Sequence, residues 1–140
     1  MQSLDPFVAF IGEHHILTFA TQSDDGPHCA TLFYAFDRER ICFVVASDVN
    51  TEHIQNALKA PEVAGAIALE THEVGKIRGL QLKGILTQSI DISDDALYYA
   101  AFPYARVMQP TFWVLHVSSM KLTDNRFGFG KKLRWPEVLG

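Results

Sequence analysis

The chain has 140 residues, enough for one domain with a core of its own, and we expect residues 1–140 to form that single domain. Apolar residues make up 48% of the sequence and charged residues 20%, the proportions of an ordinary soluble globular protein. No apolar run reaches membrane-spanning length and the N-terminus lacks a signal-peptide pattern, so we expect a cytoplasmic protein that does not associate with membranes.

Charge is distributed unevenly along the chain, although the net charge is only −4. Residues 1–75 contain 3 basic and 11 acidic side chains, whereas residues 76–140 contain 9 basic and 5 acidic side chains. This asymmetry argues against a general nucleic-acid surface and indicates a local anion site in the second half of the chain. Chance clustering of surface charges is the alternative.

Hydrophobic periodicity and turn residues predict the elements of the first half. Apolar residues between Leu4 and Ile11 recur at the spacing of an amphipathic helix, which ends at Gly12. The second and third strands carry aromatic and β-branched residues on both faces, so we expect them to be covered on both sides. The predicted elements are a helix over residues 4–11, strands over residues 14–22, 28–36 and 41–46, and a helix over residues 51–60.

The second half continues with long strands. Gly79 and Gly84 lie in an apolar strand, where they mark a bend or the close approach of another segment. Ser93 is the expected cap of a third helix. The predicted elements are strands over residues 63–69, 77–89 and 111–123, and a helix over residues 94–102. Strands and helices do not alternate strictly, so we predict a mainly β (α+β) fold, a six-stranded antiparallel split β-barrel with short peripheral helices.

Neither cysteine is expected to form a disulfide or to take part in catalysis. If a hairpin turn begins after Phe36, Cys42 lies opposite Ala35. Cys29 is then roughly 20 Å away, at about 3.3 Å per residue, which is too far for a disulfide. We expect both to be buried thiols. The six histidines lack the spacing of metal ligands, and we predict no metal site.

The C-terminal stretch 123–135 is the most distinctive part of the sequence. It combines two glycines with four cations, an asparagine and three aromatic residues. Rings can stack on a planar ligand while cations neutralise an anionic tail, so this composition favours a planar anionic ligand. A C-terminal hairpin whose cations only maintain solubility is one alternative. Another is stacking of single-stranded nucleic acid on Phe127, Phe129 and Trp135, but the acidic net charge disfavours it and we expect no nucleic-acid partner.

Thr51 begins the second predicted helix, where backbone N–H groups without helical partners can bind an anion. The Thr51 hydroxyl and His53 add donors, so a phosphate site is one interpretation. Plain helix capping is the other, and the carboxylate of Glu52 opposes an anion at this position.

The strand over residues 77–89 carries Arg78, Gln81 and Lys83 within an apolar pattern. Gln81 and Lys83 share one face of the strand. That face is either exposed to solvent or meets a ligand or a second subunit, with Gln81 suited to the edge of a heteroaromatic ring.

Four segments carry a resemblance to a known family: residues 27–37, 51–53, 77–84 and 122–132. The first two resemble the pyridoxamine 5′-phosphate oxidase-like FMN-binding split barrels, and the last two resemble the YhbP-like branch of small bacterial proteins. The resemblance covers nearly the whole chain. It implies a homodimer with two FMN sites at the subunit interface, and a flavin-dependent oxidoreductase that acts on an unknown small molecule.

The resemblance also implies which residues form the cofactor site. The second and third strands line the flavin ring in that family, which points to Thr31 and Val45 here. The phosphate site after the third strand corresponds to Thr51 and His53. Residues from the C-terminal part of the partner subunit complete the site, here Asn125, Lys131, Lys132 or Trp135.

The chain departs from the family pattern at Cys29, Glu52 and His53, where the family has basic residues. We expect Arg78 or the lysines at positions 131–132 to supply the missing positive charge. No catalytic side chain is assigned, because the flavin carries the redox chemistry and no acid–base residue stands out. A non-catalytic binding module for flavin, haem or another anionic planar ligand is the alternative function.

Overall fold

The computed structural model describes residues 3–128 and 130–137, so Phe129 and its predicted stacking role lie outside the described residues. The helices of the described residues are α1 (Asp5–Glu13), α2 (Glu52–Lys59) and α3 (Ile92–Ala101), with 3-10 turns η1 (Val74–Lys76), η2 (Pro103–Met108) and η3 (Asn125–Phe127). None of these helices is long and apolar enough to cross a membrane. The strands are β1 (Ile16–Ser23), β2 (Gly26–Asp37), β3 (Cys42–Ala46), β4 (Glu62–Ala68), β5 (Arg78–Gln88), β6 (Phe112–Asp124) and β7 (Lys132–Trp135).

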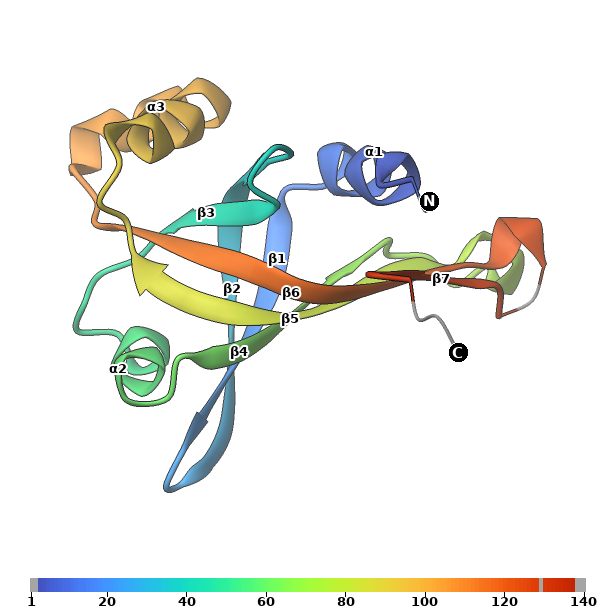
Figure 1. Ribbon diagram of the computed structural model, residues 1–140, viewed down its shortest axis with the longest axis horizontal. Coiled ribbons are helices and arrows are strands. Elements are labelled where there is room, and N and C mark those ends of the chain that lie inside the picture. The colour runs from blue at the N-terminus through green and yellow to red at the C-terminus, as the bar shows by residue number, and fades with distance from the viewer. Residues whose placement is uncertain (1–2, 129, 138–140) are drawn as a thin grey trace.

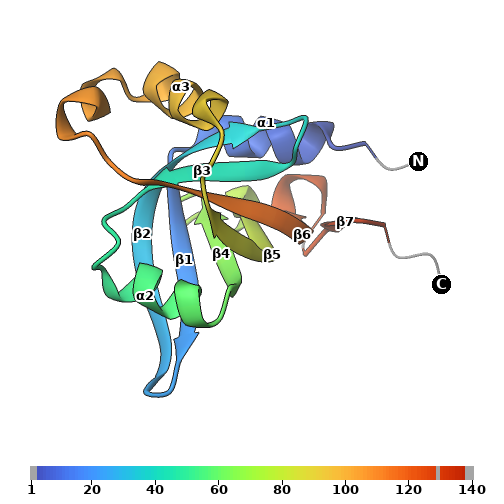
Figure 2. The same ribbon diagram turned by 60° about the vertical axis from the view of Figure 1, so that its left-hand side comes forward.

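Six strands close into a ring in the order β3-β2-β1-β4-β5-β6, because β6 also pairs with β3. Every pairing in this ring is antiparallel. The long strands β5 and β6 run side by side across the molecule, and the helices lie at its periphery (Figure 1 and Figure 2). The predicted six-stranded antiparallel split β-barrel with short peripheral helices is confirmed.

A seventh strand, β7, was not among the six predicted strands, although a C-terminal hairpin was one alternative for this stretch. It pairs with residues 120–123 of β6 and extends the sheet beyond the ring (Figure 1). Leu133 and Trp135 pack against the core, whereas Lys132 and Arg134 alternate with them and are exposed. Only four residues show this alternation, and the glycines and cations around them are typical of a loop, so periodicity did not reveal the strand.

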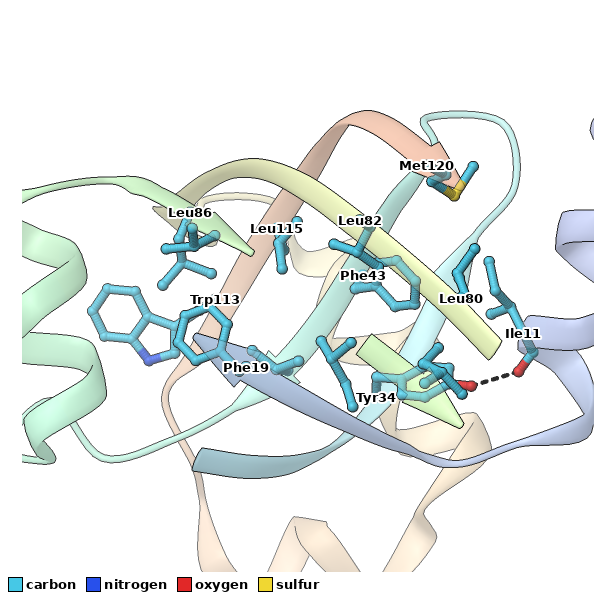
Figure 3. Packing of buried hydrophobic residues seen from close by; sticks show 14 of the residues in the cluster. Ile11, Phe19, Tyr34, Phe43, Leu80, Leu82, Leu86, Trp113, Leu115 and Met120 are labelled. Atoms are coloured by element: carbon cyan, nitrogen blue, oxygen red, sulfur yellow. Dashed lines mark hydrogen bonds between the residues drawn. The ribbon is translucent and has the colours of Figure 1, made fainter. Parts of the chain in front are cut away.

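The core fills the inside of the ring with side chains that alternate along the strands (Figure 3). Phe43 and Leu115 are completely buried, and Trp113 is 1% exposed. The hydroxyl of Tyr34 donates a hydrogen bond of 2.6 Å to the carbonyl oxygen of Ile11, which fixes α1 over one end of the barrel. Burial raises the pKa of Tyr34 well above its usual range, so this hydroxyl remains a donor.

Helix α3 covers only part of the outer face of the sheet. Tyr98 on α3 packs in a cluster with Ala35 and Val44, which closes the outer side of β3 and the adjoining end of β2. Along the rest of β2, exposed side chains alternate with half-buried ones. The expectation that the second strand is covered on both sides is therefore wrong, because this strand of 12 residues extends well beyond α3.

The β2–β3 hairpin also corrects the placement of the cysteines. The turn begins one residue later than predicted, so Cys42 lies opposite Asp37 and not opposite Ala35. Both thiols are free, and Cys42 is buried as expected. Cys29 is exposed, contrary to the prediction, because it lies on the part of β2 that α3 does not cover.

Helix α3 begins two residues earlier than predicted. Asp91 is its N-cap, and its carboxylate accepts a hydrogen bond of 2.9 Å from the backbone N–H of Ser93. Ser93, the predicted cap, is the second residue of the helix. The hydrogen bonds from Ser93 lower the pKa of Asp91, so the capping group is a carboxylate at neutral pH.

Gly84 is a position where β5 and β6 approach each other closely. A Cβ atom at residue 84 would lie 2.2 Å from the carbonyl oxygen of His116 and 2.7 Å from Cδ2 of Leu115. The register between the two strands shifts at Lys83 and Gly84. At Gly79 the nearest atom to such a Cβ is 3.7 Å away, an ordinary contact. The close approach expected at one or both glycines is therefore found at Gly84.

Gly84→Ala should destabilise the protein by about 1–3 kcal/mol, because the backbone of β6 must move to admit the new methyl group. Gly79→Ala on the same strand is the matched control and should change the free energy of unfolding by less than about 1 kcal/mol. Urea denaturation followed by circular dichroism measures both values. Equal losses in the two variants would contradict the close contact as the cause.

Candidate functional site

Cross-strand neighbours on the open outer face of the sheet form two rows of small and polar side chains. Residues directly opposite each other in antiparallel strands point to the same face. From β2 to β7, the first row contains Thr31, Thr18, Ala66, Gln81, Lys121 and Arg134. The second row contains Cys29, Ala20, Ala64, Lys83 and Ser119.

A groove of about 570 Å³ lies over these rows, from Thr18 and Cys29 at one end to Arg134 at the other. The small side chains in its middle, such as Ala66, leave room for a flat molecule to lie close to the sheet. The amide of Gln81 both donates and accepts hydrogen bonds. Cations gather at the end formed by β6 and β7. The groove therefore suits a planar ligand with an anionic group at one end.

The two residues predicted to line the ring lie on opposite sides of the sheet. Thr31 is exposed in the first row, next to Thr18 and the groove. Val45 is only 1% exposed and packs in the core, opposite Tyr34 on β2. The side chain of Val45 is therefore not on the face that carries Thr31 and Gln81.

Thr51 and His53 form a cluster of hydrogen bonds at the beginning of α2. Thr51 is the N-cap residue, as predicted, but its hydroxyl donates to the carbonyl oxygen of Asp48 at 2.8 Å instead of capping the helix. Nε2 of His53 lies 2.6 Å from the hydroxyl of Ser47 and 3.2 Å from that of Thr51. The structure thus brings the two predicted phosphate ligands together and leaves the first turn of α2 without a side-chain cap.

Glu52, His28 and His53 determine the charge around this cluster. A carboxylate oxygen of Glu52 lies 2.9 Å from Nδ1 of His28 on β2, a contact that is an ion pair only when the imidazole is protonated. Burial lowers the pKa of His53, and the nearby charge of His28 lowers it further, so His53 is neutral at pH 7. The beginning of α2 therefore offers neutral hydrogen-bond donors to an anion, but no free cation.

Two other predicted site residues form hydrogen bonds outside the groove. Arg78 donates to Glu13 at 2.8 Å and so joins β5 to α1. Asn125 donates through Nδ2 to the carbonyl oxygen of Val74 and accepts at Oδ1 from the backbone N–H of Gly130. Within this chain, neither Arg78 nor Asn125 lines the groove. Arg78 instead links β5 to α1, and Asn125 links η3 to η1 and to the loop before β7.

Strand β7 separates two grooves. Arg134 and the half-buried Trp135 border the groove over the rows. Lys132 lies on the same outer face as Arg134. Lys131 instead lines a second groove of about 510 Å³ beside α1 and η3, together with Arg78. The two lysines of the predicted basic pair, Lys131 and Lys132, therefore lie on different surfaces.

Sequence reasoning missed Thr18, Ala66, Lys121 and Arg134, which complete the first row. The alternation of the strand over residues 111–123 shows that Lys121 is on a polar face. It does not show that Lys121 lies opposite Gln81 and Arg134, because cross-strand register depends on the whole sheet.

The architecture is shared with several solved proteins. A haem-binding protein from Mycobacterium smegmatis aligns with a TM-score of 0.72 and 18% identity, over 89% of this chain and 53% of that one. An FAD-binding protein from Mesorhizobium loti has a TM-score of 0.70 and 12% identity, with 86% and 92% of the chains covered. A candidate pyridoxamine 5′-phosphate oxidase from Listeria innocua has a TM-score of 0.67 and 12% identity, with 83% and 94% covered. The fold is thus the pyridoxamine 5′-phosphate oxidase-like split barrel.

Sequence comparison identifies the family to which the chain belongs within this fold class. The chain is 37% identical over 138 residues to a UPF0306 protein of Cronobacter sakazakii, with 96% of both chains covered. It is 34% identical over 139 residues to the UPF0306 protein YhbP of Salmonella arizonae, with 96% of this chain and 94% of the relative covered. No protein-family model matches the chain. The chain belongs to the UPF0306 (YhbP) family, which confirms the resemblance seen in its strands and C-terminal stretch.

Asp124 connects the strand ends beside β7 through charged hydrogen bonds. Its carboxylate accepts from Nη2 of Arg126 at 2.8 Å and from the backbone N–H of Arg126 at 3.0 Å. It also lies 3.6 Å from Nε of Arg78. The hydrogen bond from the Arg126 side chain lowers the pKa of Asp124 below its usual range, although burial opposes this shift.

Asp124→Asn should destabilise the protein by about 2 kcal/mol at pH 7, because it weakens charged hydrogen bonds at a largely buried position. The folded-state pKa lies below the unfolded value of about 3.9, so this stabilisation is complete above that pH and is lost as the pH falls through the folded-state pKa. Urea unfolding of parent and variant at pH 7, 4 and 3 should therefore show a shrinking difference. A difference that is constant with pH would contradict the role of the charged carboxylate.

Proposed function

We propose that this chain binds a flavin, with FMN as the first candidate, across the groove on the outer face of its sheet. The observation that carries the proposal is the row in which small side chains lead to Gln81 and then to the cations Lys121 and Arg134. An isoalloxazine ring can lie on the small side chains, Gln81 can bond its edge, and cations can neutralise the phosphate. Two proteins with this fold, one FAD-binding and one a candidate pyridoxamine 5′-phosphate oxidase, support a flavin.

The proposed activity is flavin-dependent oxidation or reduction of a small molecule. A bound flavin supplies the electron transfer, and the protein positions the ring and balances the charge of its tail. The second candidate is a non-catalytic binding module for flavin, haem or another anionic planar ligand. The haem-binding protein of Mycobacterium smegmatis with the same fold favours this candidate, because haem combines a planar ring with anionic propionates.

We also propose that two copies of the chain associate through the outer face. Exposed apolar side chains occur there, with Ile16 52% and Phe33 53% exposed. These two residues are directly opposite each other on β1 and β2 and continue the outer rows. A second copy would cover them and could bring its own β7 and C-terminal residues to the groove.

Ile16→Asp should shift the protein from dimer to monomer in sedimentation velocity at micromolar concentration, because it places a charge in the proposed interface. Leu58→Asp is the matched control, since Leu58 is 55% exposed but lies on α2, away from the outer rows. The control should remain dimeric. A parent protein that is monomeric at these concentrations would refute the interface.

Ala66→Trp should reduce FMN affinity by more than about ten-fold, because the indole would occupy the middle of the groove. Ala96→Trp places the same side chain at an exposed position of α3 and should leave affinity unchanged. Quenching of flavin fluorescence measures both affinities. Binding of FMN by Ala66→Trp at the parent's affinity would exclude this groove as the flavin site. A parent protein that binds no flavin would refute the proposed function.

Reduction of the bound flavin separates the two candidates. An oxidoreductase should lose the visible flavin absorbance when NADH or NADPH is added without oxygen, whereas a binding module should keep it. A parent that binds haemin but not FMN would support the second candidate.

A further inference from the structure

The outer face of β6 and β7 carries a pair of like charges in direct contact range. Lys121 and Arg134 are directly opposite each other in the β6–β7 pairing. Side chains in such positions have Cβ atoms about 4.5–5.5 Å apart, and like charges there destabilise the sheet. Lys132 lies two residues from Arg134 on the same face, and Lys83 lies diagonal to Lys121 on β5.

None of these four cations forms an ion pair with a carboxylate of the described residues. By contrast, Arg38, Arg40, Lys76, Arg78 and Arg126 all have carboxylate partners. Three other described cations also lack such a partner, Lys59 on α2, Arg106 in η2 and Lys131 before β7. Four of the seven unpaired cations of the described residues thus share one surface, where they repel each other. Sequences that break a local rule of stability in this way commonly do so at functional sites.

The beginning of α2, where the resemblance to the family puts the phosphate, does not provide this charge. His28 lies in contact with the Glu52 carboxylate, and His53 is buried and neutral, so the described residues at the beginning of α2 present no free cation. Hydrogen bonds from charged donors contribute more than those from neutral donors. An anionic group in the groove is therefore expected at β6 and β7.

The distance between the small side chains and the cations of the groove fits an extended ligand. Three strand intervals separate Thr18 on β1 from Lys121 on β6, which is about 14 Å at 4.8 Å per interval. A ring on the small side chains of β1 and β4 can then extend a flexible tail to the cations.

We propose that Lys83, Lys121 and Arg134 form an anion subsite at the β7 end of the groove, which holds the phosphate or carboxylate group of the ligand. The identification of the anionic group as the phosphate ester of a flavin rests on the proposed function. The affinity of the subsite for an oxyanion does not depend on that function. In this arrangement the ring lies on β1 and β4, and α2 does not hold the anion.

The test is a double variant, Lys121→Gln with Arg134→Gln. FMN affinity should fall about ten-fold or more. The affinity for riboflavin, which has the same ring without the phosphate, should change less than about two-fold. The matched control, Lys59→Gln with Arg106→Gln, removes the same charge from exposed positions outside the groove that also lack a carboxylate partner among the described residues, and should bind both ligands like the parent. Thr51→Ala should reduce affinity for FMN and riboflavin alike, or for neither.

Two measurements without flavin make the subsite independent of the proposed function. Pyrophosphate or inorganic phosphate should raise the melting temperature of the parent and of the control, but not of the Lys121/Arg134 variant. In the absence of anions and at low salt, the variant should melt at a higher temperature than the parent, because the repulsion is removed.

The outcomes distinguish the two proposals. Protection by pyrophosphate that depends on Lys121 and Arg134, in a parent that binds no flavin, would keep the subsite and overturn the flavin. FMN binding that is unchanged in the Lys121/Arg134 variant would overturn the subsite and keep the flavin. A loss specific to FMN in Thr51→Ala, without one in the double variant, would place the phosphate at α2. Equal loss of FMN and riboflavin in the double variant would also overturn the subsite.

Discussion

The pairing of β3 with the first half of β6 is the interaction on which the rest of the structure depends. It closes the ring and aligns Val45 with Trp113, so that both enter the core. Both β3 and β7 pair with β6 on the edge that β5 does not occupy, β3 at residues 112–116 and β7 at residues 120–123. Strand β7 thus takes the place that β3 leaves free. The first row of the outer face extends beyond Lys121 to Arg134 only because of this exchange of partners.

How much of this could be predicted depends on the range of the signal involved. Hydrophobic periodicity is local, and it located the six strands of the ring and the three helices to within a few residues. It also assigned Gln81 and Lys83 to one face of β5, which the structure confirms, since both are exposed while Leu80 and Leu82 are buried. The exposure of Cys29 could not be read in the same way. It depends on where α3 stops covering β2, which is a tertiary property.

The candidate site was harder to predict, because it is defined by neighbours that are far apart in sequence. The resemblance pointed to Thr31 and Thr51, which do lie near the outer face and at the start of α2. It could not indicate that the side chain of Arg78 is engaged by Glu13, or that Lys121 and Arg134 are opposite each other. Composition revealed that the second half of the chain is basic. The sheet register shows which of its cations share a surface. The ion pairs of the folded chain show which of them lack carboxylate partners among the described residues.

The two sides of β7 have opposite electrostatics. On the outer side, Lys121 and Arg134 repel each other across the strand pair. Asp124, at the end of β6, instead makes attractive contacts with arginines, and Leu133 and Trp135 pack against the core. Apolar packing and the carboxylate thus hold the β7 region in place against the repulsion. Any anion that binds only to the paired form of β7 must stabilise that form by mass action. Binding of an anion at the proposed subsite would therefore be thermodynamically linked to the pairing of β7 with β6.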